Sequence, residues 1–69
     1  MILVDARGLL CPEPVVRTQR AVKDGASAVT VLVDAEAAKE NVTRFAVSRG
    51  YDVTLRQEGP DYTLTLKRA

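Results

Sequence analysis

The sequence contains no histidine and no tryptophan, and cysteine occurs once, as Cys11. One cysteine cannot close an internal disulfide, and a single thiol without histidine does not supply the usual zinc ligand sets. The lack of histidine also removes the usual general base of a cysteine hydrolase. We therefore expect neither a metal nor a cofactor, and a fold that rests on packing alone.

The sequence also lacks an excess of charge of either sign, because ten basic and nine acidic residues give a formal net charge of +1. This balance gives no global field that favours nucleic acid or a membrane surface. The longest apolar stretches are strand-sized, far below the roughly 20 residues of a membrane-spanning helix, and no secretory leader pattern opens the chain. We expect one cytoplasmic domain, residues 1–69, with no membrane contact.

Hydrophobic periodicity predicts four strands and two helices. The strand-like runs are short and apolar or alternate with polar residues, whereas the helical segments repeat apolar residues every three or four positions. The expected strands are residues 1–5, 28–33, 51–56 and 62–67, and the expected helices are residues 12–24 and 35–49. The order βαβαββ predicts an α+β two-layer sandwich with both helices on one face of a four-stranded mixed sheet.

Capping and turn residues indicate where these elements end. Asp34 is a candidate N-cap of the second helix, and Gly25 and Gly50 end the two helices. Residues 58–61 are typical of a turn and predict an antiparallel hairpin, while the β-branched run 28–33 resembles a central strand covered on more than one side. The expected inward positions are Val15, Thr18, Ala21 and Val22 in the first helix, Ala35, Ala38, Val42, Phe45 and Ala46 in the second, and Tyr51, Val53, Leu55, Tyr62, Leu64 and Leu66 in the hairpin.

Cys11 is followed by Pro12, Glu13 and Pro14, at the predicted beginning of the first helix. A thiolate at a helix N-terminus is stabilised by the positive end of the helix dipole. Prolines are compatible with the first helical turn, whose N–H groups have no intrahelical partner. If Cys11 is the N-cap, the N–H of Glu13 is the donor that remains to face its sulfur.

Neighbouring charges act on this thiol in opposite directions. The carboxylate of Glu13 raises the pKa of a nearby thiol, while Arg17, one helical turn further on, offsets that carboxylate. Arg7, in the preceding loop, is a second cation able to approach the sulfur. The sequence leaves the balance of these effects open.

A lone cysteine in an intracellular domain is commonly a small buried hydrophobe. Cys11 instead lies at a loop-to-helix junction, outside any periodic apolar face, and this position favours a functional thiol. A thiol without a base suits sulfur transfer, in which a persulfide is accepted and passed on, better than it suits acyl chemistry.

The segment Asp5-Ala6-Arg7-Gly8-Leu9-Leu10-Cys11-Pro12-Glu13-Pro14 resembles the signature of the TusA-like (SirA-like) sulfur-carrier family, a CPxP motif after D-x-R-G-x-x. The resemblance continues through residues 34–38, residues 40–42 and Gly50-Tyr51, so it covers essentially the whole chain. It implies a βαβαββ sandwich in which Cys11 carries a persulfide. The motif and support residues that it implies are Arg7, Gly8, Pro12, Glu13 and Pro14.

The second helix departs from the pattern of TusA proper, because Glu40-Asn41-Val42-Thr43-Arg44-Phe45 stands where an aspartate-isoleucine-proline step is usual. The chain looks more like the N-terminal domain of YedF-type proteins of selenium metabolism, without their second, DsrE-like domain. The sequence is therefore either a stand-alone carrier or a fragment of a longer chain. The resemblance implies a sulfur-donor protein, such as a cysteine desulfurase, and a sulfur-acceptor protein as partners.

Basic residues recur every three positions in the first helix, at Arg17, Arg20 and Lys23. With Arg7 they form a candidate basic strip, in which Arg17 and Arg20 are the candidate partner-docking residues. The plainer interpretation is a solvated helix face with internal ion pairs, such as Glu13 with Arg17. We expect no direct nucleic-acid binding, because the aromatic residues are better explained as core or sheet residues.

Two residues before the motif have alternative interpretations. Gly8 either allows a positive φ that turns the chain toward Cys11 or simply ends the first strand. Asp5 is expected to hydrogen-bond the loop at the strand end rather than to act in catalysis.

The leading hypothesis is a sulfur carrier that uses Cys11, closer to a sulfurtransferase-type carrier than to a free-standing enzyme. The alternative is a module without thiol catalysis that binds a partner through the first helix, or that regulates by thiol oxidation.

Overall fold

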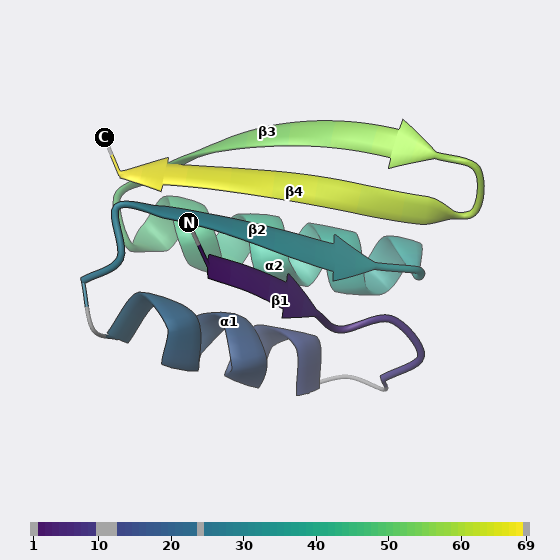
Figure 1. The fold of residues 1–69 in the computed structure, drawn as a ribbon, viewed down its shortest axis with the longest axis horizontal. Coiled ribbons are helices and arrows are strands. Elements are labelled where there is room, and N and C mark those ends of the chain that lie inside the picture. Colours follow the sequence, from purple (N-terminus) through teal and green to yellow (C-terminus); the bar gives the residue numbers. More distant parts are fainter. Residues whose placement is uncertain (1, 10–12, 24, 69) are drawn as a thin grey trace.

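The computed structural model describes residues 2–9, 13–23 and 25–68. Its elements are β1 (Ile2–Asp5), α1 (Glu13–Lys23), β2 (Ala28–Val33), α2 (Glu36–Ser48), β3 (Tyr51–Glu58) and β4 (Asp61–Arg68). The order βαβαββ is the predicted one (Figure 1). The predicted positions Pro12, at the start of the first helix, and Cys11 lie outside the described residues.

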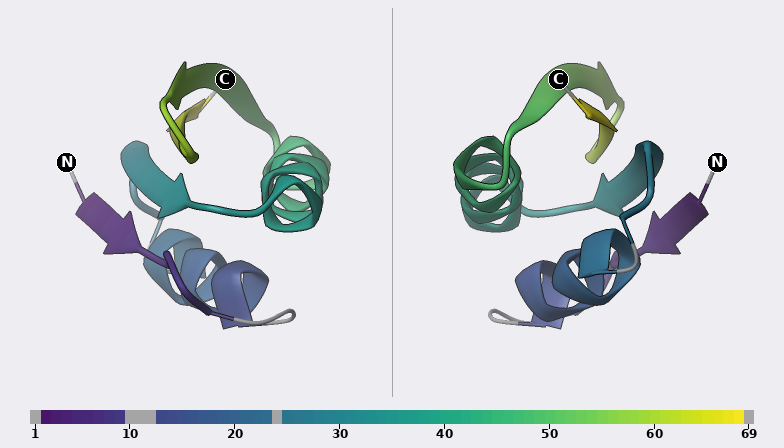
Figure 2. Two further views of the ribbon diagram at one scale, coloured as in Figure 1. Left: turned by 90° about the vertical axis from the view of Figure 1, so that its right-hand side faces the viewer. Right: turned by 90° about the vertical axis from the view of Figure 1, so that its left-hand side faces the viewer.

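The four strands form one mixed sheet in the order β1-β2-β4-β3. β1 pairs with β2 in parallel, whereas β4 pairs antiparallel with both β2 and β3. Both helices lie on the same face of this sheet (Figure 2). The structure therefore confirms the predicted two-layer α+β sandwich.

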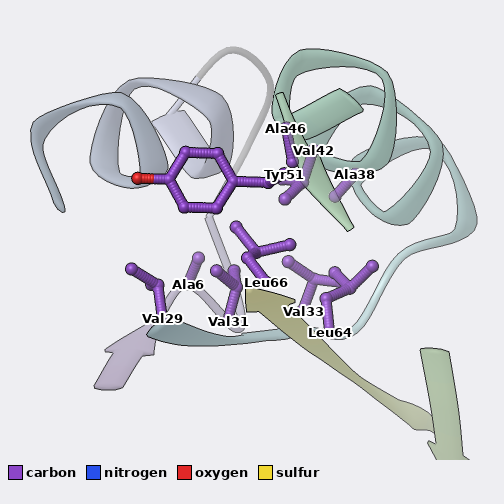
Figure 3. Packing of buried hydrophobic residues seen from close by; sticks show 10 residues of the cluster. All are labelled: Ala6, Val29, Val31, Val33, Ala38, Val42, Ala46, Tyr51, Leu64 and Leu66. Atoms are coloured by element: carbon purple, nitrogen blue, oxygen red, sulfur yellow. The ribbon is translucent and has the colours of Figure 1, made fainter. Parts of the chain in front are cut away.

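The core lies between the sheet and the helices (Figure 3). Along β2, alternate side chains point to one face because successive residues of a strand face opposite sides. Among the described residues, ten apolar side chains of this core are buried: Ala6, Val29, Val31, Val33, Ala38, Val42, Ala46, Tyr51, Leu64 and Leu66. The prediction that β2 is covered on more than one side is wrong in part, because Ala28, Thr30 and Leu32 on its other face are only half-buried.

The helix ends follow the glycines that the sequence indicated. Gly25 and Gly50 have φ angles of 76° and 84°, which place them in the left-handed region after α1 and α2. The N–H of Gly25 donates to Val22 O at 2.9 Å, and the N–H of Gly50 donates to Val47 O at 3.0 Å. These bonds satisfy carbonyl groups of each last turn, as glycine-terminated helices commonly do.

The beginning of α2 differs from the prediction. Ala35, rather than Asp34, occupies the N-cap position, with extended backbone angles and no side-chain capping bond. Ala35 is therefore exposed instead of lying on the buried helix face. The carboxylate of Asp34 forms a different contact, described below.

The predicted hairpin is present, and its strands are longer than expected. β3 and β4 pair as far as Glu58 and Asp61, so only Gly59 and Pro60 form the loop. Leu55 was expected on the half-buried face but is 47% exposed. β3 is the edge strand, and a side chain at an edge has a neighbouring strand on one side only.

Candidate functional site

The candidate site is the segment that joins β1 to α1, which contains the sequence motif. The structure describes this segment as far as Leu9 and again from Glu13. The predictions that Cys11 caps the helix and that the N–H of Glu13 faces its sulfur therefore stay predictions. The described flanks show how the segment is held at each end.

Arg7 and Asp5 form a two-pronged ion pair at the end of β1. Arg7 Nε donates to Asp5 Oδ1 at 2.9 Å, and Arg7 Nη2 donates to Asp5 Oδ2 at 2.9 Å. The backbone N–H of Arg7 also donates to Asp5 Oδ1 at 3.2 Å. The side-chain hydrogen bonds from Arg7, followed by the backbone bond, lower the pKa of Asp5 to about 2. Asp5 thus makes the local hydrogen bond expected of it at the strand end.

Arg7 also reaches across the end of β2 to β4. Its Nη1 lies 3.2 Å from Oδ2 of Asp61, the first residue of β4. The hydrogen bonds to Asp5 and then to Asp61 raise the pKa of the Arg7 guanidinium above its ordinary value. Arg7 was predicted as a cation able to approach the thiol, and the structure shows its guanidinium engaged by two carboxylates.

Gly8 turns the chain away from β1 and is tied to β2. Its φ angle of 75° lies in the left-handed region, so the turn is the interpretation that the structure supports. The N–H of Gly8 donates to Asp34 Oδ2 at 2.9 Å. This contact explains why Asp34 does not cap α2, since its carboxylate is directed to the loop that follows β1.

The residues on either side of Gly8 are packed. Ala6 is 1% exposed, and its N–H donates to Leu32 O at 2.8 Å, which continues the parallel ladder beyond β1. Leu9 is half-buried against the core, and its N–H closes a turn with Ala6 O at 3.4 Å. The chain is therefore fixed up to two residues before Cys11.

The first turn of α1 fixes the other flank. Glu13 is the first residue of α1 and is exposed, whereas Pro14, the second residue, is buried. The hydroxyl of the fully buried Thr18 donates to Pro14 O at 2.8 Å. Arg17 Nε lies 3.8 Å from Glu13 Oε2, which is the expected pair one helical turn apart. Both side chains of that pair are about half-exposed, so solvent screens their interaction.

The predicted basic strip is divided by the fold. Arg17 and Arg20 line a hollow of about 240 Å³ beside β1, together with Leu3, Val4 and Asp5. Arg20 also lines a larger groove of about 620 Å³ at the ends of α1 and α2. The other residues of this groove are Val16, Gln19, Val22, Lys23, Phe45, Arg49, Tyr51 and Arg68. Sequence spacing identified the helix cations but not Arg49 and Arg68, which other elements supply.

The aromatic rings have structural partners. The guanidinium of Arg49 lies 5.1 Å from the centre of the Phe45 ring, and Lys39 Nζ lies 5.1 Å from that of Tyr62. Tyr51 is buried, and its hydroxyl donates to Ala26 O at 2.6 Å. These contacts agree with the expected core and sheet roles of the three rings.

The described residues contain neither a metal-binding cluster nor a membrane-spanning helix. No group of three or more histidine, cysteine, aspartate or glutamate side chains in this part of the chain is placed to hold a metal ion. Among the described helices, neither is long and apolar enough to cross a membrane.

A family model for sulfurtransferase TusA matches residues 2–68. The chain belongs to this family. A candidate sulfur carrier protein of Methanocaldococcus jannaschii is 37% identical over 57 residues, covering 80% of this chain and 76% of the relative. The candidate sulfur carrier protein YrkI of Bacillus subtilis is 38% identical over 53 residues, covering 74% and 71%.

The fold of this TusA family member is also that of a solved relative. The crystal structure of a SirA-like protein from Desulfitobacterium hafniense superposes with a TM-score of 0.88 and is 32% identical in sequence. The match covers 97% of this chain and 96% of that protein. Family membership and the names of the relatives support a sulfur-carrier role, which in general requires donor and acceptor proteins.

Proposed function

We propose that Cys11 accepts a sulfane sulfur from a donor protein and passes it to an acceptor protein. The Cys11 thiolate attacks the outer sulfur of the donor persulfide, a new S–S bond forms on Cys11, and the donor leaves as a thiolate. In the second step an acceptor thiolate attacks the outer sulfur on Cys11, and the Cys11 thiolate leaves. The two exchanges conserve electrons overall, so neither needs an added oxidant or reductant.

The observation that carries this proposal is the anchoring of both flanks of the motif in a TusA family chain. Gly8 is held by Asp34, and Pro14 is buried and bonded by Thr18. Only the short segment between Leu9 and Glu13 joins these anchors, and it bears the single thiol of the sequence. Fixed flanks restrict a reactive group to few positions, which favours its delivery into a partner's site.

Partner docking is proposed for Arg17 and Arg20 on the exposed face of α1. Arg17 lies one helical turn from Glu13, beside the motif, and Arg20 joins the hollow near β1 to the groove at the helix ends. A donor or acceptor with acidic residues would contact this face while the start of α1 approaches its active site. Such surface charges mainly change the rate of association.

The compartment and the cargo are part of the same proposal. A thiol that must stay free between transfers suits the reducing cytoplasm. The likeness to the N-terminal domain of YedF-type proteins extends the cargo to selenium. Loading by a cysteine desulfurase that is given cysteine and selenocysteine in competition, followed by elemental analysis, distinguishes the two cargoes.

The test is loading of the protein with labelled sulfur. The chain is incubated with a cysteine desulfurase and radiolabelled cysteine, and the product is mapped by mass spectrometry without reductant. We expect one added sulfur atom on Cys11, none in Cys11→Ala, and transfer to an acceptor thiol on chase. Failure of several active desulfurases and of chemical persulfide donors to label Cys11 would contradict the proposal.

The second candidate is a binding module that needs no thiol, and the basic groove at the ends of α1 and α2 favours it. For this module, Cys11→Ser keeps partner binding, whereas a double variant that removes Arg20 from this groove (Arg20→Gln) and Arg17 from the hollow beside β1 (Arg17→Gln) loses it. A redox regulator would instead show a Cys11 mixed disulfide that forms without any sulfur donor.

A further inference from the structure

β3 is an edge strand of eight residues whose outer side is unpaired within the described part of the chain. Its inner side pairs with β4 along its whole length. Figure 1 shows β3 at one border of the sheet, with β1 and α1 at the other. An open strand edge presents backbone N–H and C=O groups that can pair with another strand.

Apolar side chains accompany this open edge. Val53 and Leu55 face the helix layer, because their register partners Leu66 and Leu64 are both buried there. Leu55 is nevertheless 47% exposed. A groove of about 440 Å³ between β3 and α2 is lined by Lys39, Glu40, Thr43, Arg44, Val53 and Leu55.

The sequence of β3 is self-complementary about Thr54. In an antiparallel pair of two β3 strands centred on Thr54, Asp52 of one copy lies opposite Arg56 of the other. Val53 then lies opposite Leu55, and each pairing occurs twice because of the two-fold symmetry. Within the described residues, neither Asp52 nor Arg56 forms an ion pair.

Charge also opposes a neighbouring register. A slip by two residues toward the β3–β4 turn places Asp52 opposite Glu58, and like charges directly opposite are destabilising. The register centred on Thr54 is the one in which opposite charges and apolar residues both match. The sequence of β3 itself supplies the complementary residues, so the pattern favours a second copy of this chain as the partner.

We propose that the outer edge of β3 binds β3 of a second copy, antiparallel and centred on Thr54. The dimer joins the two four-stranded sheets into one continuous sheet and covers Leu55 of each copy with Val53 of the other. One strand pair is a small interface, below about 1,200 Å². The dimer is accordingly weak, with a dissociation constant on the order of 10–100 µM.

This dimer uses the strand edge opposite to β1 and α1. The loop that follows β1 reaches β4 through the contact of Arg7 with Asp61, and β4 separates this loop from the outer edge of β3. The inference is independent of the sulfur-carrier proposal. A Cys11→Ser variant, unable to carry sulfur, must dimerise as the unaltered chain does.

The experiment uses charge reversals in sedimentation velocity, with reductant present, from about 10 to about 500 µM. Asp52→Arg and Arg56→Asp each place like charges opposite one another, so each alone should weaken dimerisation at least tenfold. In an equimolar mixture of the two variants both pairs are complementary, and a heterodimer should form. The chain carrying both changes should dimerise like the unaltered protein.

Glu36→Arg is the matched control for Asp52→Arg, since it also replaces an acidic residue by arginine, at an exposed position of α2 outside the groove. It should leave dimerisation unchanged, and circular dichroism checks that every variant is folded. The proposal is overturned by a monomer throughout the concentration range, by single reversals that dimerise normally, or by a mixture that fails to associate.

Discussion

The carboxylate of Asp34, just after β2, accepts the backbone N–H of Gly8 at 2.9 Å across 26 residues of sequence. Gly8 lies three residues before Cys11, and its positive φ lies in the left-handed region that favours glycine. The bond joins the loop that leads to the thiol to one of the two inner strands of the sheet. Replacement of Asp34 therefore tests whether that loop is held by the sheet.

Asp34→Ala removes the acceptor of the Gly8 N–H and should lower the free energy of unfolding by about 1 kcal/mol. Asp34→Asn retains a carbonyl acceptor in the same place and should cost less. Urea unfolding measures the stability of both variants. The rate of Cys11 alkylation in native buffer measures how readily a reagent reaches the thiol that follows this loop. Equal stability and equal alkylation rates in all three proteins would contradict a holding role.

Gly8→Ala should destabilise the protein through its backbone angle rather than through crowding. A Cβ at this position would meet no atom within 4 Å, so space is not limiting. The φ of 75° costs an ordinary side chain about 1–2 kcal/mol. Gly8→Asn, which tolerates this region better, should lie between the two proteins in thermal melts. An alanine variant as stable as the unaltered chain would show that the loop adopts another conformation.

The ion pair of Arg7 and Asp5 predicts a loss of stability in acid. The pKa of Asp5 is lowered from 3.8 to about 2 in the folded chain, chiefly by its hydrogen bonds from Arg7. A folded-state pKa below the unfolded value stabilises the protein above pH 4, and this contribution disappears as the pH falls from about 4 to about 2. As the pH is lowered over this range, the urea midpoint of Asp5→Asn should fall less steeply than that of the unaltered protein. The same slope in both proteins would exclude Asp5 as a contributor.

Leu66 and Leu55 should respond very differently to truncation. Leu66 is fully buried between the sheet and the helices, and its replacement by alanine should cost about 2–5 kcal/mol. A domain of this size has a net stability of only about 3–5 kcal/mol, so Leu66→Ala should be largely unfolded at room temperature. Leu55→Ala, at an exposed edge position, should change stability by about 0.5 kcal/mol or less in dilute solution. Far-ultraviolet circular dichroism distinguishes the two results.

Local patterns were enough to predict the elements, and contacts distant in sequence were not. Alternation along β3 and β4 and the turn around Gly59 predicted the hairpin correctly, because neighbouring residues determine turns and strand faces. The length of the strands was underestimated. Gln57 and Glu58 are polar and exposed, so their place in β3 depends on pairing with β4 rather than on hydrophobic pattern.

The anchors of the candidate site show the limit of the sequence more clearly. Asp34 directly precedes a helical pattern, and its interpretation as an N-cap used the common local preference of aspartate. The loop amide of Gly8 reaches it only because β1 and β2 are adjacent in the sheet. Asp61 likewise looked like a turn residue, whereas its contact with Arg7 spans 54 residues. The geometry of Cys11 itself stays a prediction.

Asp5, Asp34 and Asp61 stand at the ends of three different strands. Asp5 and Asp61 accept hydrogen bonds from Arg7, and Asp34 accepts one from Gly8. The loop that leads to the thiol is consequently held only while β1, β2 and β4 are assembled together. A chain whose hairpin has opened loses Asp61, and one whose inner strand has frayed loses Asp34. Under the proposed function, only molecules with these strands assembled present the thiol on a held loop, and the exchange rate of the Gly8 amide proton reports on the contact between that loop and the end of β2.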